Sequence, residues 1–363
     1  MRSIEWKVCL LGAAMFFVAT AQARDAQPIV FASQPRVGYP EGIAWNDRAG
    51  AFLVSSLRGG QVGLVSLDGR YTSFSSDRSL ITTSGIAVDA ARNRVLVCNE
   101  DVGISNKSLP STRNRVAQVV EFDLNTGVLR HVYDFSRLTS GPILANDLTV
   151  DTQGNVYVTD SFQPQIYKID HATGDVSVLV RSDRLMPAAP AKAVGTQPYL
   201  NGIVYHPDGF LIVADYSRGL LWKVPLDEPQ ALTEIRLPQR LKGPDGLLLK
   251  SPTELVAVQS FPSRAQGMSG DVTLLSSSDA WASARIEAVA TPPGLDGPTT
   301  ATLKDGEVWV MNSRFPHLFA DLTTADRVLQ FSIVRVEFKH TGSVERAPSN
   351  ALIPNDDRNA GSH

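Results

Sequence analysis

Six residues with side-chain oxygen atoms occupy the same position in six copies of one sequence phrase. Counting back five residues from the polar residue that ends the first strand of each copy gives Glu41, Ser84, Asn146, Asn201, Asp245 and Thr299. Four of these supply two carboxylates and two amide oxygens, a set of hard donors that suits Ca²⁺ and suits a soft metal poorly: Glu41, Asn146, Asn201 and Asp245. The pattern therefore predicts a divalent-cation site, with Ca²⁺ preferred and Zn²⁺, Mg²⁺ or Mn²⁺ as alternatives.

Each of these residues taken alone is typical of a turn or a cap. Pro244-Asp245-Gly246 has the same letters as Pro207-Asp208-Gly209, which reads as a turn between two strands. Register separates the two triplets, because Asp208 falls between a first and a second strand, whereas Asp245 falls where Asn201 does in the preceding copy. The shared phase of the four residues favours the metal site.

The elements that must position these residues are short strands. Segments 146–180 and 201–235 align without a gap, and each reads as four apolar strands separated by turns. The second strand recurs six times, as GAFLVSS (50–56), NRVLVCN (93–99), GNVYVTD (154–160), GFLIVAD (209–215), TELVAVQ (253–259) and GEVWVMN (306–312). Six such copies predict an all-β fold, a six-bladed β-propeller of four-stranded antiparallel blades whose first strands line the axis.

Two further features concern the closure and the rim of the ring. The last copy lacks a clear fourth strand, and PIVFAS (28–33) is a spare strand before the first copy, so we expect this N-terminal strand to complete the sixth blade. Insertions at 100–115, 185–200 and 260–270 fall on connections that share one rim of a propeller. They are predicted to overhang the same mouth of the channel.

The ends of the chain predict its compartment. Arg2 and Lys7 precede the apolar stretch Val8–Thr20, and Ala21-Gln22-Ala23 is a cleavage signal of the secretory type. We therefore expect a signal peptide at 1–23, a propeller at 24–338 and a polar tail at 339–363 in a periplasmic or secreted protein without a membrane segment after cleavage. The mature chain would keep one cysteine, Cys98, in an apolar strand where a buried, inert thiol is expected.

Composition and motifs exclude several classes of function. The formal net charge is −3 and the pI about 6.1, so the chain lacks the basic field that neutralises phosphates, and no nucleic-acid partner is expected. The sequence contains no G-x-S-x-G elbow, H-E-x-x-H pair, Walker loop or dinucleotide-binding glycine motif after a strand. Serine hydrolase and dehydrogenase functions therefore lose their main support.

The ordered set Pro40-Glu41-Gly42, Asn146-Asp147, Asn201-Gly202 and Pro244-Asp245-Gly246 resembles the gluconolactonase/regucalcin family and its distant relatives, the diisopropylfluorophosphatases and paraoxonases. The resemblance covers about residues 36–338. It implies a six-bladed propeller with a catalytic divalent cation, usually calcium, that hydrolyses lactones, esters or organophosphates. It also implies that Glu41, Asn146, Asn201 and Asp245 are the metal ligands and that Asp245 is the general base or nucleophile.

The chain departs from that family in ways that bear on the substrate. Sugar-lactone hydrolases of the family carry an arginine two residues before the asparagine of the third blade, and Leu144 stands there, so a more apolar lactone or ester is favoured. The paraoxonase-type histidine pair is absent, since His131 lies on a predicted outer strand, which leaves Asp245 as the better base. His317 is predicted on the substrate-side rim as a candidate for proton transfer.

The remaining pocket residues and the alternatives complete the prediction. Five further polar residues are predicted to contribute to substrate binding: Ser84, Asp147, Ser260, Thr299 and Asn312. The chain is expected to act as a monomer on a small lactone or ester. The main alternative is a non-catalytic periplasmic propeller that binds a ligand or serves as a scaffold with a structural ion. A third possibility, a protein resembling strictosidine synthase, keeps the fold but does not rely on the metal ligands.

Overall fold

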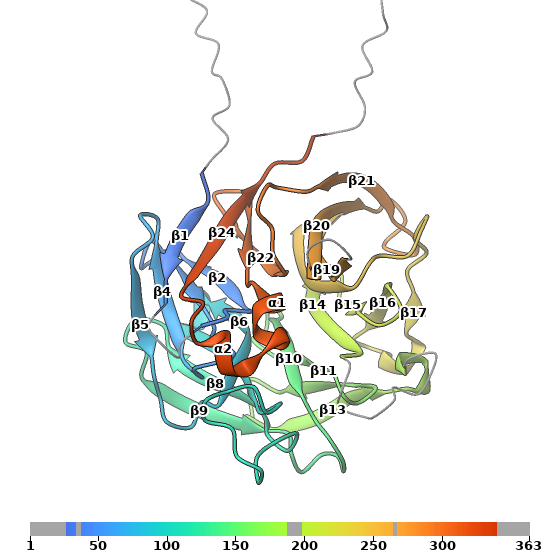
Figure 1. Ribbon diagram of the computed structural model, residues 1–363. Helices are drawn as coiled ribbons and strands as arrows, with labels where there is room; N and C mark the ends of the chain where they lie inside the picture. The colour runs from blue at the N-terminus through green and yellow to red at the C-terminus, as the bar shows by residue number, and fades with distance from the viewer. Residues whose placement is uncertain (1–26, 34–37, 187–197, 264–266, 340–363) are drawn as a thin grey trace, which may run out of the picture.

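The computed structural model describes residues 27–33, 38–186, 198–263 and 267–339, which form six four-stranded antiparallel sheets. The sheets follow one another round a ring (Figure 1). In the first five, the strands are paired in chain order. This confirms the predicted six-bladed propeller.

In the first three blades, short apolar strands are separated by turns, as the repeat predicts. The first blade holds β2 (Ile43–Asn46), β3 (Ala51–Val54), β4 (Val62–Ser66) and β5 (Tyr71–Ser75). The second holds β6 (Thr82–Asp89), β7 (Arg94–Glu100), β8 (Ala117–Asp123) and β9 (Leu129–Asp134). The third holds β10 (Ala145–Val150), β11 (Val156–Asp160), β12 (Gln165–Ile169) and β13 (Val176–Arg181).

The last three blades follow the same plan with one change at the end. The fourth holds β14 (Leu200–His206), β15 (Phe210–Asp215), β16 (Leu220–Pro225) and β17 (Thr233–Glu234). The fifth holds β18 (Pro244–Ser251), β19 (Glu254–Ser263), β20 (Gly267–Ser276) and β21 (Arg285–Ala290). The sixth is built from β22 (Pro298–Lys304), β23 (Glu307–Asn312), β24 (Gln330–Val336) and β1 (Ile29–Ala32).

Strand β1 closes the ring as the fourth strand of the sixth blade. It pairs antiparallel with β24, with Ile29 opposite Ile333 and Phe31 opposite Phe331. Its alternating pattern buries Ile29 and Phe31 in an apolar cluster that includes Trp309 and spans the sixth and first blades. The predicted closure by the N-terminal strand is therefore confirmed.

The core is divided into six apolar clusters, each lying mainly between two neighbouring blades. Ile212 of β15 packs in one cluster with Leu255 of β19, and Leu96 of β7 packs in another with Val156 of β11. Cys98 is fully buried in that second cluster, as expected, and burial raises the pKa of its thiol well above the usual range. Blade-to-blade packing therefore holds the ring together, and it fixes the inner strands around the axis.

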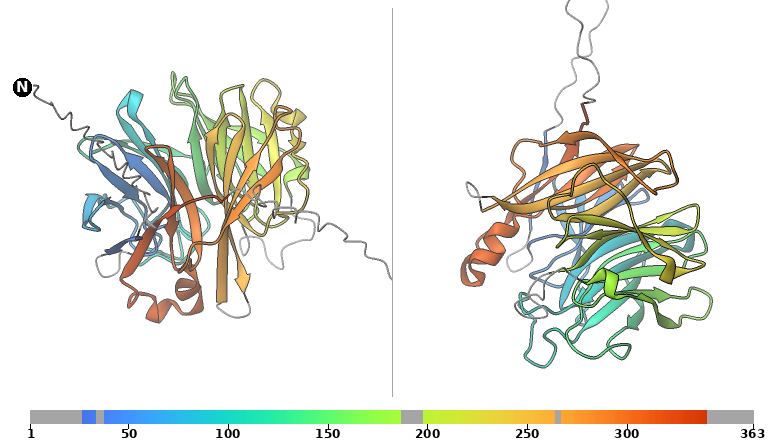
Figure 2. Two further views of the ribbon diagram at one scale, coloured as in Figure 1. Left: turned by 90° about the horizontal axis from the view of Figure 1, so that it is seen from above. Right: turned by 90° about the vertical axis from the view of Figure 1, so that its right-hand side faces the viewer.

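Three segments differ from the sequence prediction or extend it. Helices α1 (Phe315–Ala320) and α2 (Leu322–Ala325) lie between β23 and β24, where no helix was predicted. The described part of the fifth-blade insertion lengthens β19 and β20 into a long hairpin. Figure 2 shows the helices and this hairpin projecting from the same face of the ring. Short 3₁₀ helices occur as η1 (Ala90–Arg92), η2 (Asp183–Leu185) and η3 (Pro229–Ala231).

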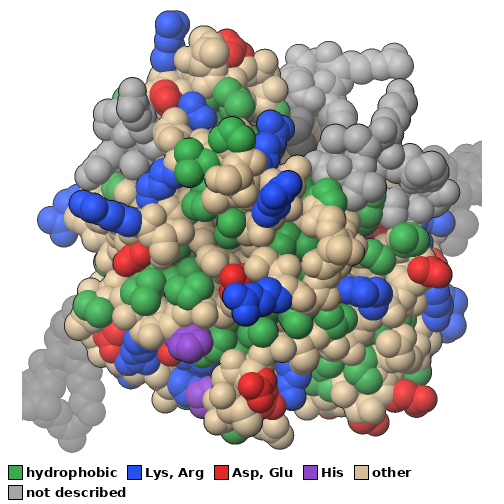
Figure 3. Space-filling view, turned by 90° about the horizontal axis from the view of Figure 1, so that it is seen from below, with side chains coloured by type: hydrophobic (Ala, Val, Ile, Leu, Met, Phe, Trp, Pro, Cys, Tyr) green, Lys and Arg blue, Asp and Glu red, His purple; other side chains and the backbone are tan. Residues whose placement is uncertain are grey.

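The surface and the chain ends add little to the positioning of a site. None of the helices in the described part of the chain has the length and apolar character that a membrane crossing requires. On the face seen in Figure 3, Lys and Arg side chains are spread among acidic, apolar and other side chains. The predicted signal peptide and nearly all of the predicted tail lie outside the described residues.

Candidate functional site

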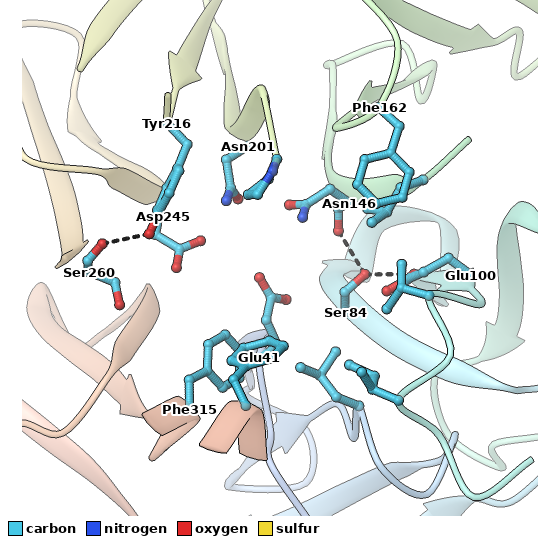
Figure 4. Close-up of a pocket in the computed structure, with 16 residues that line it drawn as sticks. Glu41, Ser84, Glu100, Asn146, Phe162, Asn201, Tyr216, Asp245, Ser260 and Phe315 are labelled. Carbon is cyan, nitrogen blue, oxygen red and sulfur yellow. Dashed lines mark hydrogen bonds between the residues drawn. The ribbon is translucent and has the colours of Figure 1, made fainter. Parts of the chain in front are cut away.

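The inner strands share an irregularity of pairing near the site. In five blades two residues of the inner strand interrupt the register: Ser84-Gly85, Asn146-Asp147, Asn201-Gly202, Asp245-Gly246 and Thr299-Thr300. In the first blade the matching pair, Glu41 and Gly42, lies just before β2. Such bulges redirect a side chain. Figure 4 shows Glu41, Asn146, Asn201 and Asp245 arranged around one space, to which four different blades contribute.

Glycine at the second position of the pair lets neighbouring inner strands approach closely. A Cβ atom on Gly42 would lie 2.3 Å from the carbonyl oxygen of Ser84 in the next blade. A Cβ atom on Gly202 would lie 2.5 Å from the carbonyl oxygen of Asp245. Both distances are too short for a side chain, so these two glycines bring Glu41 and Asn201 toward the axis.

A cavity of about 380 Å³ opens above the four oxygen donors. Its walls are mainly apolar, and its polar groups gather around the donor cluster. It is lined by Glu41, Leu57, Ser84, Glu100, Val102, Ile104, Leu144, Asn146, Phe162, Pro198, Asn201, Tyr216, Asp245, Ser260, Phe315 and Phe319. Among these lining residues there is no Arg, Lys or His, so the described part of the lining carries negative and neutral groups only.

Three oxygen atoms of the predicted ligand set are buried without a hydrogen-bond partner. They are Glu41 Oε2, Asn146 Oδ1 and Asn201 Oδ1. Unpartnered buried oxygens cost free energy, and native proteins keep them where they have another use. Together with the Asp245 carboxylate they form a set of hard donors facing one space, and this fits a hard divalent cation. In the part of the chain that the structure describes, no group of three or more His, Cys, Asp or Glu side chains is placed to hold a metal ion, and the candidate set takes two of its four donors from asparagine.

The two carboxyl groups of this cluster are electrostatically strained. Burial is the main cause that raises the pKa of Glu41 well above its usual range, and the charges of Asp245, Asp147 and Glu100 add to it. Burial likewise raises the pKa of Asp245, with the charge of Asp147 adding and a hydrogen bond from Asn201 opposing. Repulsion between buried carboxylates is relieved by protonation or by a cation, and one divalent ion balances both charges.

Hydroxyl groups on neighbouring strands hold the backbone of the donor residues in place. Thr299 Oγ1 donates to the Glu41 carbonyl oxygen at 2.7 Å, and Thr159 Oγ1 donates to the Asn201 carbonyl oxygen at 2.7 Å. Ser84 Oγ lies 2.9 Å from the Asn146 carbonyl oxygen. Thr299 and Ser84 were both predicted to bind substrate. Ser84 does line the cavity, whereas Thr299 is fully buried and holds the ring.

Of two other residues predicted to bind substrate, Ser260 lines the cavity and Asp147 does not. Ser260 lines the cavity, and its Oγ is buried without a partner. Asp147 accepts hydrogen bonds from the backbone nitrogens of Leu148 (2.8 Å) and Ile203 (3.4 Å), and burial raises its pKa to about 7. It is not among the lining residues.

Asn312 and His317 also lie outside the cavity lining. Asn312 Oδ1 accepts a hydrogen bond from Asp296 N at 2.7 Å, and Asn312 Nδ2 donates to Gly294 O at 3.0 Å, so Asn312 fixes a connection between blades. His317 is on α1, its side chain is 44% exposed, and its Nε2 lies 3.2 Å from Asp296 Oδ2. The structure therefore brings Phe315 and Phe319 of α1 into the cavity and leaves His317 outside it.

Glu100 and Tyr216 line the cavity but were not predicted to do so. Glu100, Tyr216 and Ser260 each follow the polar residue at the end of a second strand: Asn99, Asp215 and Gln259 respectively. The ends of the second strands share a phase, as the first strands do, and this phase marks a second ring of positions. The aromatic wall formed by Phe162, Phe315 and Phe319 had no comparable signal.

The rim is assembled from segments that are distant in sequence. Ile104, Pro198 and Ser260 belong to the three predicted insertions and line the cavity, so the described parts of these insertions meet at one mouth. Arg58 connects two rim segments: it donates to the Ile104 carbonyl oxygen at 2.6 Å and its Nε lies 2.9 Å from Asp326 Oδ1, just after α2. The apolar wall is thus fixed to the ring by hydrogen bonds and an ion pair.

A six-bladed propeller with oxygen donors converging on one cavity at its axis defines the class of protein. The chain belongs to the SMP-30/gluconolactonase/LRE-like family, whose conserved region matches residues 39–264. The resemblance predicted from the ordered donor residues is confirmed. No curated protein sequence matches the chain significantly.

Solved structures share the fold at low sequence identity. A gluconolactonase from Xanthomonas campestris is 15% identical with a TM-score of 0.55, over 88% of this chain and 93% of that one. A luciferin-regenerating enzyme is 13% identical with a TM-score of 0.53, over 85% and 95%. A streptogramin B lyase is 11% identical with a TM-score of 0.51, over 85% and 98%. These likenesses support the propeller fold alone.

Proposed function

We propose that this protein is an exported, metal-dependent hydrolase of apolar lactones or related esters, with Ca²⁺ as its cation. Membership of the SMP-30/gluconolactonase/LRE-like family supports a lactonase-type hydrolase. The observation that carries the metal is the set of three buried oxygens without partners, on Glu41, Asn146 and Asn201, that face one space with the Asp245 carboxylate.

These four side chains would hold the cation. The chemistry that a divalent cation would supply there is polarisation of a substrate carbonyl, stabilisation of the oxyanion and a lower pKa for a bound water. The four side chains line the same cavity as the rim residues, so a substrate in the cavity could place its carbonyl group against them.

The chain's own groups would perform the remaining tasks. Asp245 takes a proton from the attacking water as the bond between the water oxygen and the carbonyl carbon forms. The walls contributed by Phe162, Phe315 and Leu144 exclude water and hold an apolar acyl or ring portion by burial. The absence of Arg, Lys and His from the lining residues argues against a substrate whose recognition needs a cationic side chain.

A non-catalytic binding propeller is the second candidate, and one observation favours it. Among the lining residues none is a histidine, so the proton chemistry depends on carboxyl groups alone. A binder would need the ion and the apolar walls but no base.

The experiment that separates the candidates starts from protein stripped with EGTA. Calcium binding is measured by calorimetry, and hydrolysis is then measured with and without Ca²⁺ on apolar γ-lactones, alkyl esters, aryl esters and phosphotriesters. Hydrolysis that requires Ca²⁺ and is lost in Asp245→Ala supports the enzyme. Tight Ca²⁺ binding without turnover on any panel member supports the binder, and no Ca²⁺ binding contradicts the metal site.

A matched control comes from the second Pro-Asp-Gly triplet of the chain. Asp208 has the same neighbours in sequence as Asp245, but its side chain is 70% exposed in a turn. Asp208→Ala should keep both Ca²⁺ binding and turnover. Loss of activity in this variant as well would show that the Asp245 result reflects general damage.

Export is a separate part of the proposal. Residues 1–23 have the features of a signal peptide, so the mature chain should begin near Arg24 outside the cytoplasm. The mass of the protein purified from its source tests this. A mass that includes residues 1–23 would contradict it.

A further inference from the structure

A third carboxyl group faces the cavity from outside the donor cluster. Glu100, the last residue of β7, lines the cavity and is only 2% exposed. Figure 4 places Glu100 and Asp245 on opposite sides of the space around which Glu41, Asn146 and Asn201 are arranged. A substrate bound over the cluster would therefore lie between the two carboxyl groups.

The hydrogen bond from Ser84 indicates which oxygen of Glu100 can carry a proton. Ser84 Oγ donates to Glu100 Oε2 at 2.9 Å and also lies 2.9 Å from the Asn146 carbonyl oxygen. Oε2 accepts this bond as the carbonyl oxygen of a neutral acid, so the acid proton would be on Oε1. The geometry thus fits a carboxylic acid that is anchored at Oε2 and lines the cavity with its proton free for a bound group.

The surrounding charges agree with a neutral Glu100. One divalent cation balances Glu41 and Asp245, and no lining residue carries a positive charge that could balance a third carboxylate. Burial raises the pKa of Glu100 well above its usual range, the bond with Ser84 opposes, and the adjacent charge of Asp101 adds to the increase. Burial of an unpaired carboxylate is costly, so protonation is the favoured state.

We propose that Glu100 is a second catalytic carboxyl group, the acid that protonates the leaving oxygen of an unactivated alkyl ester or lactone. This inference rests on the proposed hydrolase function and names its substrate class. An alkoxide is a poor leaving group, so an acid opposite the base matters most for alkyl esters and lactones and little for aryl esters.

The step balances in atoms and charge. The water oxygen bonds to the carbonyl carbon and its proton passes to Asp245. The bond between the carbonyl carbon and the ester oxygen then breaks, and the leaving oxygen takes its electron pair together with the Glu100 proton. The products are a carboxylic acid and an alcohol, joined in one molecule for a lactone. Asp245 returns its proton to Glu100 through solvent.

The test compares leaving groups in Glu100→Gln. Glutamine keeps the size and the contact with Ser84 but cannot donate a carboxyl proton. For a δ-lactone or alkyl ester we expect kcat/KM to fall about 100-fold, a typical contribution of a general acid. For the p-nitrophenyl ester of the same acid the loss should be at least tenfold smaller. An equal loss on both substrates would overturn the proposal, as would no loss on the alkyl ester.

Two controls separate this result from structural damage. Glu228 is an exposed glutamate whose side chain makes no cap hydrogen bond, so Glu228→Gln should match the wild type on both substrates. Glu100→Asp keeps the acid and should retain more of the alkyl-ester activity than Glu100→Gln. If the aspartate variant loses the alkyl ester selectively to the same extent, proton donation from this position is contradicted.

Infrared spectroscopy gives a readout that needs no turnover. The difference spectrum between wild type and Glu100→Gln, both loaded with Ca²⁺ at pH 7, should contain the C=O band of a protonated carboxylic acid. Carboxylate bands in its place would overturn the inference even in an active enzyme. If the wild type hydrolyses no panel member, the proposed function fails, and the infrared result then shows separately whether the neutral acid exists.

Discussion

Two groups of carboxylates in this propeller are equally buried but are bonded in opposite ways. Asp160 at the end of β11 accepts hydrogen bonds from the backbone nitrogens of Leu144 (3.1 Å) and Phe162 (2.9 Å) and from the Tyr167 hydroxyl (2.7 Å). Glu41, in contrast, has an oxygen without any partner. We call an acid whose oxygens are fully hydrogen-bonded within the protein, such as Asp160, a frame acid. An acid with an unpartnered oxygen, such as Glu41, is available to bind a ligand.

Asp101 and Glu100 show the same contrast between neighbours in sequence. Asp101 Oδ1 accepts from Gly103 N (2.8 Å) and Ser108 Oγ (2.7 Å), and its Oδ2 accepts from Thr112 Oγ1 (2.6 Å), which orders the insertion above the cavity. Glu100 has Ser84 alone and faces the cavity. A buried acid whose oxygens all accept hydrogen bonds stabilises the fold. A buried acid with an unpartnered oxygen lowers the stability of the fold but can bind a ligand or take part in a reaction.

The largest predicted effect comes from removing a frame acid. Asp160→Ala would leave the donors of Leu144, Phe162 and Tyr167 without partners inside the protein, each worth about 1–3 kcal/mol. We expect the free energy of unfolding to fall by about 4 kcal/mol, measured by urea denaturation. A loss of less than about 1 kcal/mol would show that hydrogen-bond saturation does not mark the frame acids.

The second prediction is a variant that raises the free energy of unfolding instead of lowering it. In metal-free protein, Asp245→Asn removes a buried charge beside Glu41 and should raise the free energy of unfolding by about 1–2 kcal/mol, within the range for relieving a strained site. The same variant should lose the stabilisation that saturating Ca²⁺ gives the wild type. Asp208→Asn, at the exposed matched position, should do neither. Destabilisation of the metal-free protein by Asp245→Asn would contradict the contrast.

The third prediction concerns pH. The pKa values of Glu41 and Asp245 are raised in the folded protein, and that of Asp147 is raised to about 7, so the folded state holds protons that the unfolded chain has released. Their contribution to stability is fully present below the unfolded pKa, near 4, and is lost as pH rises through the folded values.

The measurement is a series of melting temperatures between pH 5 and pH 8 in EGTA and in saturating Ca²⁺. The Tm of the metal-free protein should fall across this range, and the fall should be smaller with Ca²⁺ because the cation replaces the protons. Asp245→Asn should have a flatter profile than the wild type in EGTA. A Tm that rises with pH in the metal-free wild type would reverse the sign and reject the assignment.

Much of the fold followed from the sequence because each blade repeats one pattern. The alternation of apolar residues and turns predicted the strands, and shared phase placed Glu41, Asn146, Asn201 and Asp245 at one end of the axis. The helices between β23 and β24 escaped prediction because a six-residue helix that starts at Phe315 has too few turns to show a period. The hairpin of β19 and β20 escaped because its residues resemble a polar loop.

The roles of individual polar side chains were harder to predict. Asn201 and Asn312 both stand beside strand ends, but Asn201 is the first residue of a bulge, whereas Asn312 pairs opposite Pro298 and bonds to a connection. The hydrogen-bond partners of Glu100 and Asp101 depend on how a sixteen-residue insertion folds back, and residue order alone does not show this. Sequence phase identifies a ring of positions, and tertiary bonding decides which members are free for a ligand.

The smallest predicted effect concerns the rim. The Arg58 guanidinium reaches the carbonyl oxygens of Ile104 (2.6 Å) and Leu322 (3.1 Å) and the Asp326 carboxylate (2.9 Å), so one planar group connects the second-blade insertion with the helices. The test is the variant Arg58→Lys. Lysine keeps the positive charge, but its compact ammonium group cannot make all these bonds at once. Because the pair is partly exposed, we expect a loss of stability below about 1 kcal/mol.

The apolar wall would be less well ordered, so KM for an apolar lactone should rise about threefold with kcat nearly unchanged, since the rim binds substrate and transition state alike. A fall in kcat without a change in KM would mean that Arg58 acts on the reacting groups. The hydrogen-bonded structural groups and the groups that react would then not be separate at the rim.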